Sequence, residues 1–216
     1  MKPDSLVVGL FETRCYWYPL GPDTKDCCII DPGDDGTVII NQIAESGLIP
    51  KIVLLTHGHF DHVAALPALR EHYGPLLEIA IHVADISYLG PDSLEVHRET
   101  FRHAPEVVSL VEKAWQPLPK ATRILDEGQK IGTLRVLHLP GHTPGSVAFY
   151  DESSGILFTG DTLFRDGIGS TAFPGSNIDA LRASLKRLSG MDGTIRIFPG
   201  HGASELLAKA PSRVLH

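Results

Sequence analysis

Three histidines and an aspartate crowd into six residues, His57, His59, Asp61 and His62, directly after a compact apolar run over 51–55. The run predicts a buried strand, and the glycine at position 58 lets the backbone turn sharply after it. Imidazoles packed at a buried strand end repel one another when protonated and need partners when neutral. A bound cation resolves both problems. Because thiolates are absent from the cluster, the donor types favour zinc, iron or manganese.

Three more candidate ligands stand alone in the sequence: His142, Asp161 and His201. Each has a glycine neighbour and follows a predicted strand, so the loops that carry them can converge on one point. A lone histidine beside a glycine is more often a turn or surface residue. The cluster at 57–62 nevertheless strengthens the case for metal binding by all three of these residues. Seven ligands are too many for one tetrahedral ion. They suit two ions about 3.5–4 Å apart that share one carboxylate and one oxygen derived from water.

Alternation of short apolar runs with amphipathic segments predicts the fold class, which is α/β. The predicted strands cover 15–18, 27–30, 51–55, 78–82, 132–138, 146–151, 155–159 and 194–198. The predicted helices cover 37–46, 62–73 and 176–189, the last with a capping box at Ser176 and Asp179. The segment over 84–119 has few β-branched residues and predicts short helices and loops that cover the site. We expect two mixed sheets packed together with helices outside.

Composition narrows the function classes further. The chain has 216 residues, 43% of them apolar, and a net charge of −7, which suits one domain or two small ones with a real core. The acidic balance argues against a broad nucleic-acid or anionic-membrane surface. No apolar run reaches the ~20 residues of a membrane helix, and Glu12 and Arg14 interrupt the N-terminal apolar stretch, so no signal peptide is expected. Three cysteines, two of them adjacent, form a poor disulfide framework and favour a reducing, cytoplasmic setting.

The segments THGHFDH, PGHTPGS, TGDTLF and FPGHG, with the DPG turn at 31–33, resemble the metallo-β-lactamase superfamily in order and spacing. The resemblance spans nearly the whole chain and implies an αββα sandwich, here a single domain over 1–216 whose covering segment is 84–119. It implies that His57, His59 and His142 hold one divalent metal ion and that Asp61, His62 and His201 hold the other. Asp161 would bridge the two ions, which we expect to be zinc, with iron or manganese as alternatives. Asp31 would lie beside the ligands and support them.

Within this superfamily the chain resembles the glyoxalase II group, the hydroxyacylglutathione hydrolases. Thr13-Arg14-Cys15-Tyr16 resembles the group's N-C-Y segment, with arginine at the usual asparagine position. Residues 164–176 resemble its G-R-T-D-F-P segment, but Ser170 and Ala172 stand where arginine and aspartate are common. The resemblance implies cleavage of a thioester such as S-lactoylglutathione by a metal-bridging hydroxide. Asp61 would both ligate a metal and accept the proton of the hydroxide.

Three alternatives remain open at this point. The same scaffold serves a mononuclear-iron persulfide dioxygenase. The same dinuclear site serves lactonases and other esterases. The third alternative is a metal site without a catalytic role. Antibiotic hydrolysis is not expected, because those members generally lack an aspartate at the position of Asp161. The substrate is expected to be a small thioester or thiol-derived molecule, not a nucleic acid or a membrane, and the oligomeric state is open. Candidate substrate-binding residues are Arg98, Arg102, Lys113, Arg165, His97 and His103.

Overall fold

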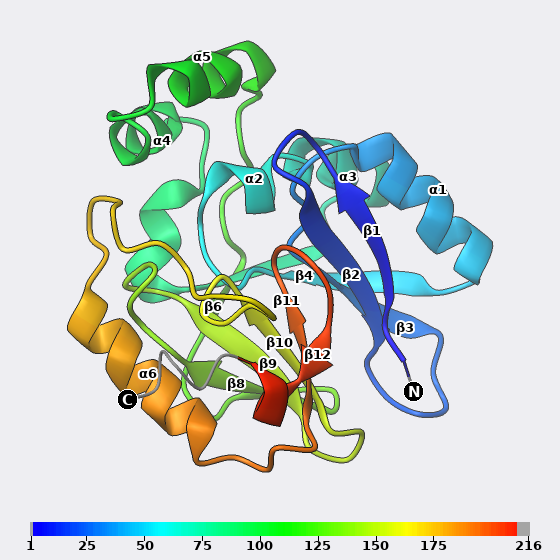
Figure 1. The fold of residues 1–216 in the computed structure, drawn as a ribbon. Helices are drawn as coiled ribbons and strands as arrows, with labels where there is room; N and C mark the ends of the chain where they lie inside the picture. The colour runs from blue at the N-terminus through cyan, green and yellow to red at the C-terminus, as the bar shows by residue number, and fades with distance from the viewer. Residues whose placement is uncertain (1, 211–216) are drawn as a thin grey trace.

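Two six-stranded sheets lie face to face, with helices on their outer sides, in the computed structural model, which describes residues 2–210 (Figure 1). The first sheet has the order β1-β2-β3-β4-β5-β6. Its strands are β1 (Asp4–Val8), β2 (Thr13–Pro19), β3 (Asp26–Ile30), β4 (Ile49–Leu54), β5 (Glu78–His82) and β6 (Arg123–Leu125). The pairs from β1 to β3 are antiparallel, and those from β3 to β6 are parallel.

The second sheet has the order β12-β11-β10-β9-β8-β7. Its strands are β7 (Lys130–Ile131), β8 (Leu134–His138), β9 (Val147–Asp151), β10 (Ile156–Gly160), β11 (Arg196–Pro199) and β12 (Glu205–Leu206). In this sheet β10 and β11 pair in parallel, and the other neighbours are antiparallel, including β9 and β10. The predicted fold class, α/β with two mixed sheets flanked by helices, is confirmed.

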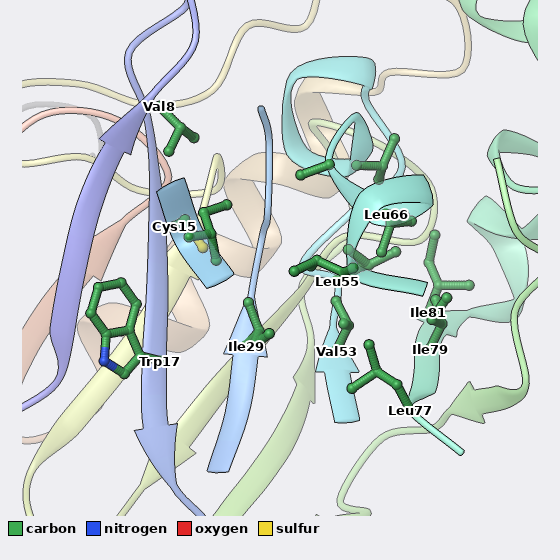
Figure 2. Close-up of a cluster of buried hydrophobic side chains, with 14 of the residues drawn as sticks. Val8, Cys15, Trp17, Ile29, Val53, Leu55, Leu66, Leu77, Ile79 and Ile81 are labelled. Atoms are coloured by element: carbon green, nitrogen blue, oxygen red, sulfur yellow. The ribbon is translucent and has the colours of Figure 1, made fainter. Parts of the chain in front are cut away.

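Alternating side chains place one core between the sheets and one outside each of them. Along β2, Tyr16 and Tyr18 face the second sheet, where the Tyr16 ring lies 5.2 Å from that of Phe158. Cys15 and Trp17 point the other way, into the cluster under the helices of the first sheet (Figure 2). This period of two is what a strand buried on both faces requires. It fixes the register of the strands whose ends carry the candidate ligands.

The helices occupy the outer faces and one end of the sandwich. They are α1 (Gly36–Ser46), α2 (Phe60–Val63), α3 (Leu66–Tyr73), α4 (Leu94–Thr100), α5 (Pro105–Ala114) and α6 (Ile178–Ser189), with 3-10 turns η1 (Val83–Tyr88) and η2 (Leu207–Lys209). Within residues 2–210, no helix has both the length and the apolar character needed to cross a membrane.

Two helix predictions need correction. The predicted single helix over 62–73 is two helices, α2 and α3, and Pro67 lies in the first turn of α3. Proline cannot donate to the carbonyl four residues earlier and its ring clashes with that group, so one continuous helix is interrupted there. The cap of α6 is Asn177, not Ser176: its side-chain oxygen accepts the backbone N–H groups of Asp179 and Ala180, both at 2.9 Å.

Candidate metal centre

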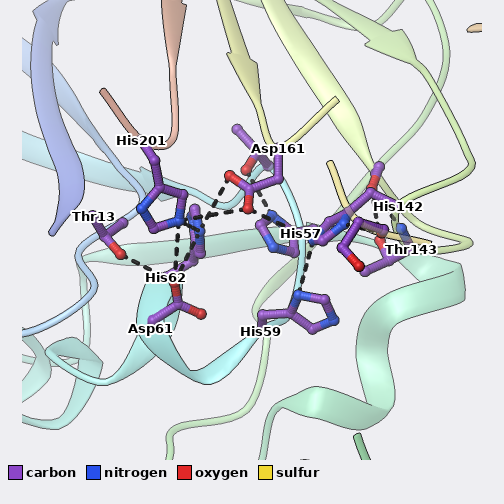
Figure 3. Close-up of polar contacts among 12 residues, drawn as sticks. Thr13, His57, His59, Asp61, His62, His142, Thr143, Asp161 and His201 are labelled. Carbon is purple, nitrogen blue, oxygen red and sulfur yellow. Dashed lines mark hydrogen bonds and ion pairs between the residues drawn. The ribbon is translucent and has the colours of Figure 1, made fainter. Parts of the chain in front are cut away.

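All seven predicted ligands meet at one edge of the sandwich, where strands from both sheets end (Figure 3). The first sheet supplies four of them from the loop and short helix that follow β4. The second sheet supplies His142 after β8, Asp161 at the end of β10 and His201 after β11. Convergence of strand ends explains how residues up to 144 positions apart can share one site.

His57, His59 and His142 form the first group, which contains imidazoles alone. All three are buried, and one ring nitrogen of each lies within 4.8 Å of the others. His59 Nδ1 and His142 Nε2 are 3.0 Å apart. Donor atoms that face one common point in this way are what a cation would need.

Asp61, His62 and His201 form the second group, which contains a carboxylate. His62 Nε2 lies 3.3 Å from His201 Nε2, and Asp61 Oδ2 lies 3.4 and 3.3 Å from these two nitrogens. His62 is fully buried, whereas the His201 side chain is 27% exposed. The second group is therefore the side of the centre that is more open to solvent.

Asp161 lies between the two groups and reaches both. Its Oδ1 is 3.5 Å from His62 Nε2, and its Oδ2 is 3.7 Å from His142 Nε2 and 3.5 Å from His201 Nε2. Gly200 packs against this carboxylate so closely that a Cβ atom there would overlap Asp161 Oδ1. A carboxylate in this place can be shared by two cations.

Two donor atoms of the centre lack hydrogen-bond partners, which also fits the binding of divalent cations. His57 Nε2 and Asp161 Oδ1 are buried and have no hydrogen-bond partner. A buried polar atom left without a partner costs about 1–3 kcal/mol, and a coordinated cation would remove that cost. Nitrogen and oxygen donors of this kind serve zinc, iron and manganese alike.

Asp31 contacts the second group, and the family resemblance had implied a place for it beside the ligands. Its Oδ2 lies 3.0 Å from His62 Nδ1 and accepts the Thr56 hydroxyl at 2.6 Å, while its Oδ1 accepts the Thr56 backbone N–H at 2.8 Å. Its φ of 51° lies in the left-handed region, which aspartate tolerates better than most residues. The hydrogen bond fixes the tautomer of His62 and directs Nε2 toward the centre.

Backbone carbonyls orient two further ligands. His142 Nδ1 donates to the carbonyl of Ser170 at 2.8 Å, and His201 Nδ1 donates to the carbonyl of Phe11 at 2.9 Å. Position 170 thus acts on His142 through its main chain. This accounts for how serine can stand there, where relatives of the resembled group commonly carry arginine, without loss of that contact.

The Thr13–Tyr16 segment, noted in the sequence only as a resemblance, holds the loop of His201. The backbone N–H of Arg14 donates to Gly200 O at 2.7 Å, and its side chain donates to Gly202 O. The Tyr16 hydroxyl donates to Pro199 O at 2.7 Å, and the Thr13 hydroxyl donates to Asp61 Oδ2 at 3.1 Å. The first antiparallel strands therefore bear directly on the second group of ligands.

Asp85 is a supporting residue that the sequence did not reveal. It is fully buried and accepts hydrogen bonds from the Gly58 N–H at 3.1 Å and from the Gly145 N–H and the Thr143 hydroxyl, each at 2.7 Å. It thereby joins the loop of His57 and His59 to the loop of His142. Burial raises its pKa although these hydrogen bonds lower it. Only its burial distinguishes it from a surface aspartate, and no sequence pattern carries that information.

Gly58 has a different role from the predicted one. Its φ angle is not positive, so the turn does not need the conformational freedom of glycine. A Cβ atom at this position would instead overlap the ring of Tyr88. Glycine is required because η1 packs directly on the ligand loop.

The two groups differ electrostatically in the protein without metal. Burial lowers the pKa values of His57 and His59 well below normal, and the neighbouring imidazoles lower them further. Burial also lowers the pKa of His62, but the carboxylates of Asp61, Asp161 and Asp31 outweigh it and raise that pKa to about 9. In the same way Asp161 and Asp61 raise the pKa of His201 to about 11. His57 and His59 are therefore neutral, whereas His62 and His201 hold protons against the carboxylates beside them.

The predicted substrate-binding residues lie on the covering helices and loops. Arg98 pairs with Glu95 and Glu112, Arg102 pairs with Glu99, and Arg165 pairs with Asp166. The ring of His103 accepts a hydrogen bond from Arg102. Contact between these residues and a substrate stays a prediction.

His97, also predicted as a possible substrate contact, is fully buried. Its Nε2 donates to the carbonyl of Tyr88 at 3.0 Å, and its ring packs against Phe60 and Trp115. Burial lowers its pKa to about 4. These contacts make His97 part of the packing beneath the covering helices.

Comparison with known proteins agrees with this geometry. The chain is 34% identical over 204 residues to a Haemophilus influenzae protein named hydroxyacylglutathione hydrolase GloC, covering 94% of this chain and 92% of that one. Among solved structures, TTHA1623 in a di-iron-bound form is 35% identical with a TM-score of 0.75, covering 95% and 96% of the two chains. BLEG-1, described as a B3 metallo-beta-lactamase, is 28% identical with a TM-score of 0.79, covering 96% and 95%.

A family model described as the metallo-beta-lactamase superfamily matches residues 10–201. This range contains all seven candidate ligands, Asp31 and both sheets apart from β1 and the terminal β12. On the joint evidence of matched sequence, sandwich topology and clustered donors, the chain belongs to the metallo-beta-lactamase superfamily.

Proposed function

We propose that this protein is a metal-dependent hydrolase that cleaves small thioesters such as S-lactoylglutathione. The observation that carries the proposal is Asp161, whose carboxylate lies within 3.7 Å of ring nitrogens of both donor groups and could be a ligand shared by two cations. The similarity to a protein named hydroxyacylglutathione hydrolase supports the choice of thioester. We propose zinc as the metal, with iron as the alternative that the similarity to a di-iron structure supports.

Divalent cations held by the seven residues would supply hydroxide at neutral pH and polarise the carbonyl of the substrate. The chain itself positions the donors and controls protons. Asp61, whose pKa is lowered by His62 and His201 despite burial, stays ionised and can accept a proton at Oδ2. The Thr13 hydroxyl holds that oxygen in place. Asp31 and the carbonyls of Ser170 and Phe11 keep the ligand imidazoles in one tautomer.

The surroundings of the first group favour chemistry that needs no acid for the leaving group. The Phe173 ring lies 4.9 Å from that of His59 and 5.8 Å from that of His142, and the Phe101 ring lies 5.8 Å from that of His59. This aromatic wall offers no proton to a leaving group. A thiolate departs without protonation, whereas an amine does not. The wall therefore supports a thioester over an amide.

Other substrates are distinguished by one experiment on the metal-loaded protein. Metal content is measured by mass spectrometry, and turnover is measured on S-lactoylglutathione, a lactone, a phosphodiester, a β-lactam and, with oxygen uptake, glutathione persulfide. We expect two metal ions per chain and the highest kcat/KM on the thioester. A single iron with oxygen uptake would instead support the dioxygenase. Undiminished thioesterase activity in a metal-free preparation would refute the proposed mechanism.

The proposed partner is a small molecule, with no nucleic acid or membrane. The three cysteines, Cys15, Cys27 and Cys28, are buried and unbridged, which suits the reducing cytoplasm that we propose as the location. β-Lactam hydrolysis has a place in the panel because of the similarity to BLEG-1.

A further inference from the structure

A pocket of about 240 Å³ adjoins the second group of ligands, with Asp61 in its wall. Four segments enclose it: the turn between β1 and β2, the loop after β3, the start of α2 and one face of α5. Figure 1 shows α5, in green, set apart from the sheets on the side of α2. The lining residues are Val8, Gly9, Leu10, Phe11, Gly33, Asp34, Phe60, Asp61, Leu110, Val111, Lys113 and Ala114.

The wall of this pocket is apolar, and side chains from separate elements build it. Phe60 and Val111 are almost completely buried beneath it, while Phe11 and Leu110 stand 39% and 37% exposed at its opening. Apart from Asp61, the charged lining residues are Asp34 and Lys113, which have opposite signs and are both exposed. The opening therefore carries no net charge to select an ionic group, and apolar contact dominates inside.

We propose that this pocket binds the acyl group of the substrate and that the enzyme prefers branched or aromatic acyl groups over small ones. This inference rests on the proposed thioesterase function. Asp61 belongs both to the candidate metal centre and to the pocket, so a chain that enters the pocket leads away directly from the reacting carbonyl. The occupant is thus the part of the thioester attached to the carbonyl carbon.

The size of the pocket supports this assignment. It is smaller than the roughly 300–1,000 Å³ of pockets that enclose a drug-sized ligand, so it holds one arm of a substrate and not the whole. An apolar cavity of about 150 Å³ already accepts benzene, so a single ring or a branched chain fits. Thiol carriers such as glutathione are long and polar, and an apolar pocket of this size would strip them of water without replacing their hydrogen bonds.

The test uses the metal-loaded full chain and thioesters of one thiol, N-acetylcysteamine, with acetyl, isovaleryl and phenylacetyl groups. Burial of apolar surface gives up to about fourfold per methylene, so we expect kcat/KM at least about tenfold higher for the two larger groups. Leu110→Trp fills the opening and should reduce this ratio at least fivefold. Ile178→Trp is the matched control, since Ile178 is 39% exposed on α6 and outside the pocket; it should leave the ratio unchanged.

Two results would overturn the assignment: equal kcat/KM for all three acyl groups, or an equal effect of Leu110→Trp on all of them. If no thioester is hydrolysed, the proposed function fails. A binding experiment then tests separately whether the pocket takes an apolar group. The probe is then the ketone analogue of the phenylacetyl substrate, which carries a methylene in place of sulfur. Shifts in the methyl resonances of Val8, Leu110 and Val111 on its addition would support an apolar binding site, and unchanged resonances would exclude one.

Discussion

The two groups of candidate ligands share one carboxylate but differ in charge and exposure. His57, His59 and His142 offer only imidazole nitrogens in a buried, aromatic setting. In the second group, His62 lies beside the three carboxylates of Asp31, Asp61 and Asp161, and the group reaches solvent through His201.

Different forces shape the metal-free state of each group. In the first, desolvation disfavours protonation of His57 and His59, and Nε2 of each ring has no hydrogen-bond partner. In the second, carboxylates stabilise the imidazolium form, so protons occupy the place of a cation. The comparison predicts that the two groups differ in metal stoichiometry after loss of a ligand and in the pH dependence of their Kd for metal. It also predicts that different neighbouring residues support metal binding at each group.

The largest effect is expected from removing the shared carboxylate. Asp161→Ala withdraws a donor from both groups and should abolish binding of two ions together with nearly all turnover, at least about 10³-fold in kcat. His57→Ala withdraws a donor from the first group only; turnover should be lost as completely, but one metal ion should remain. Metal content and kcat are measured side by side, with His72→Ala, at an exposed position of α3, as control. Two bound ions in Asp161→Ala would contradict the shared role.

Proton release on metal binding should separate the groups next. Ligands must lose their protons to bind a cation. Because the pKa values of His62 and His201 are raised to about 9 and about 11, both are protonated at pH 7. The Kd of the second group should therefore rise as pH falls from 8 to 6, by up to about 100-fold per pH unit for two protons.

His57 and His59 should contribute little to the pH dependence of the Kd of the first group over the same range, because their pKa values are already lowered. Calorimetric titration of metal-free protein in buffers of different ionisation enthalpy counts the protons released in each step. Equal proton release in the two steps would remove the electrostatic distinction between the groups.

Loss of the Asp31 charge beside His62 should weaken metal binding at the second group alone. Asp31→Asn keeps an oxygen that can accept the His62 N–H but removes the negative charge 3.0 Å away. We expect a 10–100-fold loss of metal affinity at the second group and no change at the first. Asp192→Asn, on an exposed turn, serves as control. An equal loss at both groups would show that Asp31 supports the fold and not one ligand set.

The smallest effect is expected from Arg14, which holds the loop after His201 through Gly202 O. Arg14→Ala should lower metal affinity at the second group only a few-fold, because the backbone hydrogen bond from Arg14 to Gly200 remains. Arg182→Ala, on the exposed face of α6, is the control in the same titration. A loss above about 100-fold would mean that the side chain, and not the strand pairing, positions His201.

Prediction from the sequence succeeded where local pattern carries the information. The cluster at 57–62 is visible because its donors are neighbours in the chain, and most strands are visible because buried β-structure needs continuous apolar runs. The prediction was wrong at Pro67 and at the cap of α6, where two adjacent residues, Ser176 and Asn177, are equally suited to cap. The Ser176 hydroxyl donates instead to the carbonyl of His142 at 2.7 Å, a contact that depends on the tertiary structure.

The sequence by itself determined the donor types, their spacing and the strands that would carry them, because these depend on residue chemistry and periodicity. Only the tertiary structure decided that Asp85 joins two ligand loops and that an apolar pocket opens beside Asp61. The same holds for Gly58, where the ring of Tyr88 leaves no room for a side chain. Each of these depends on contact between segments far apart in the chain. Such contacts are set by the packing of the two sheets and the covering helices, which no single stretch of sequence encodes.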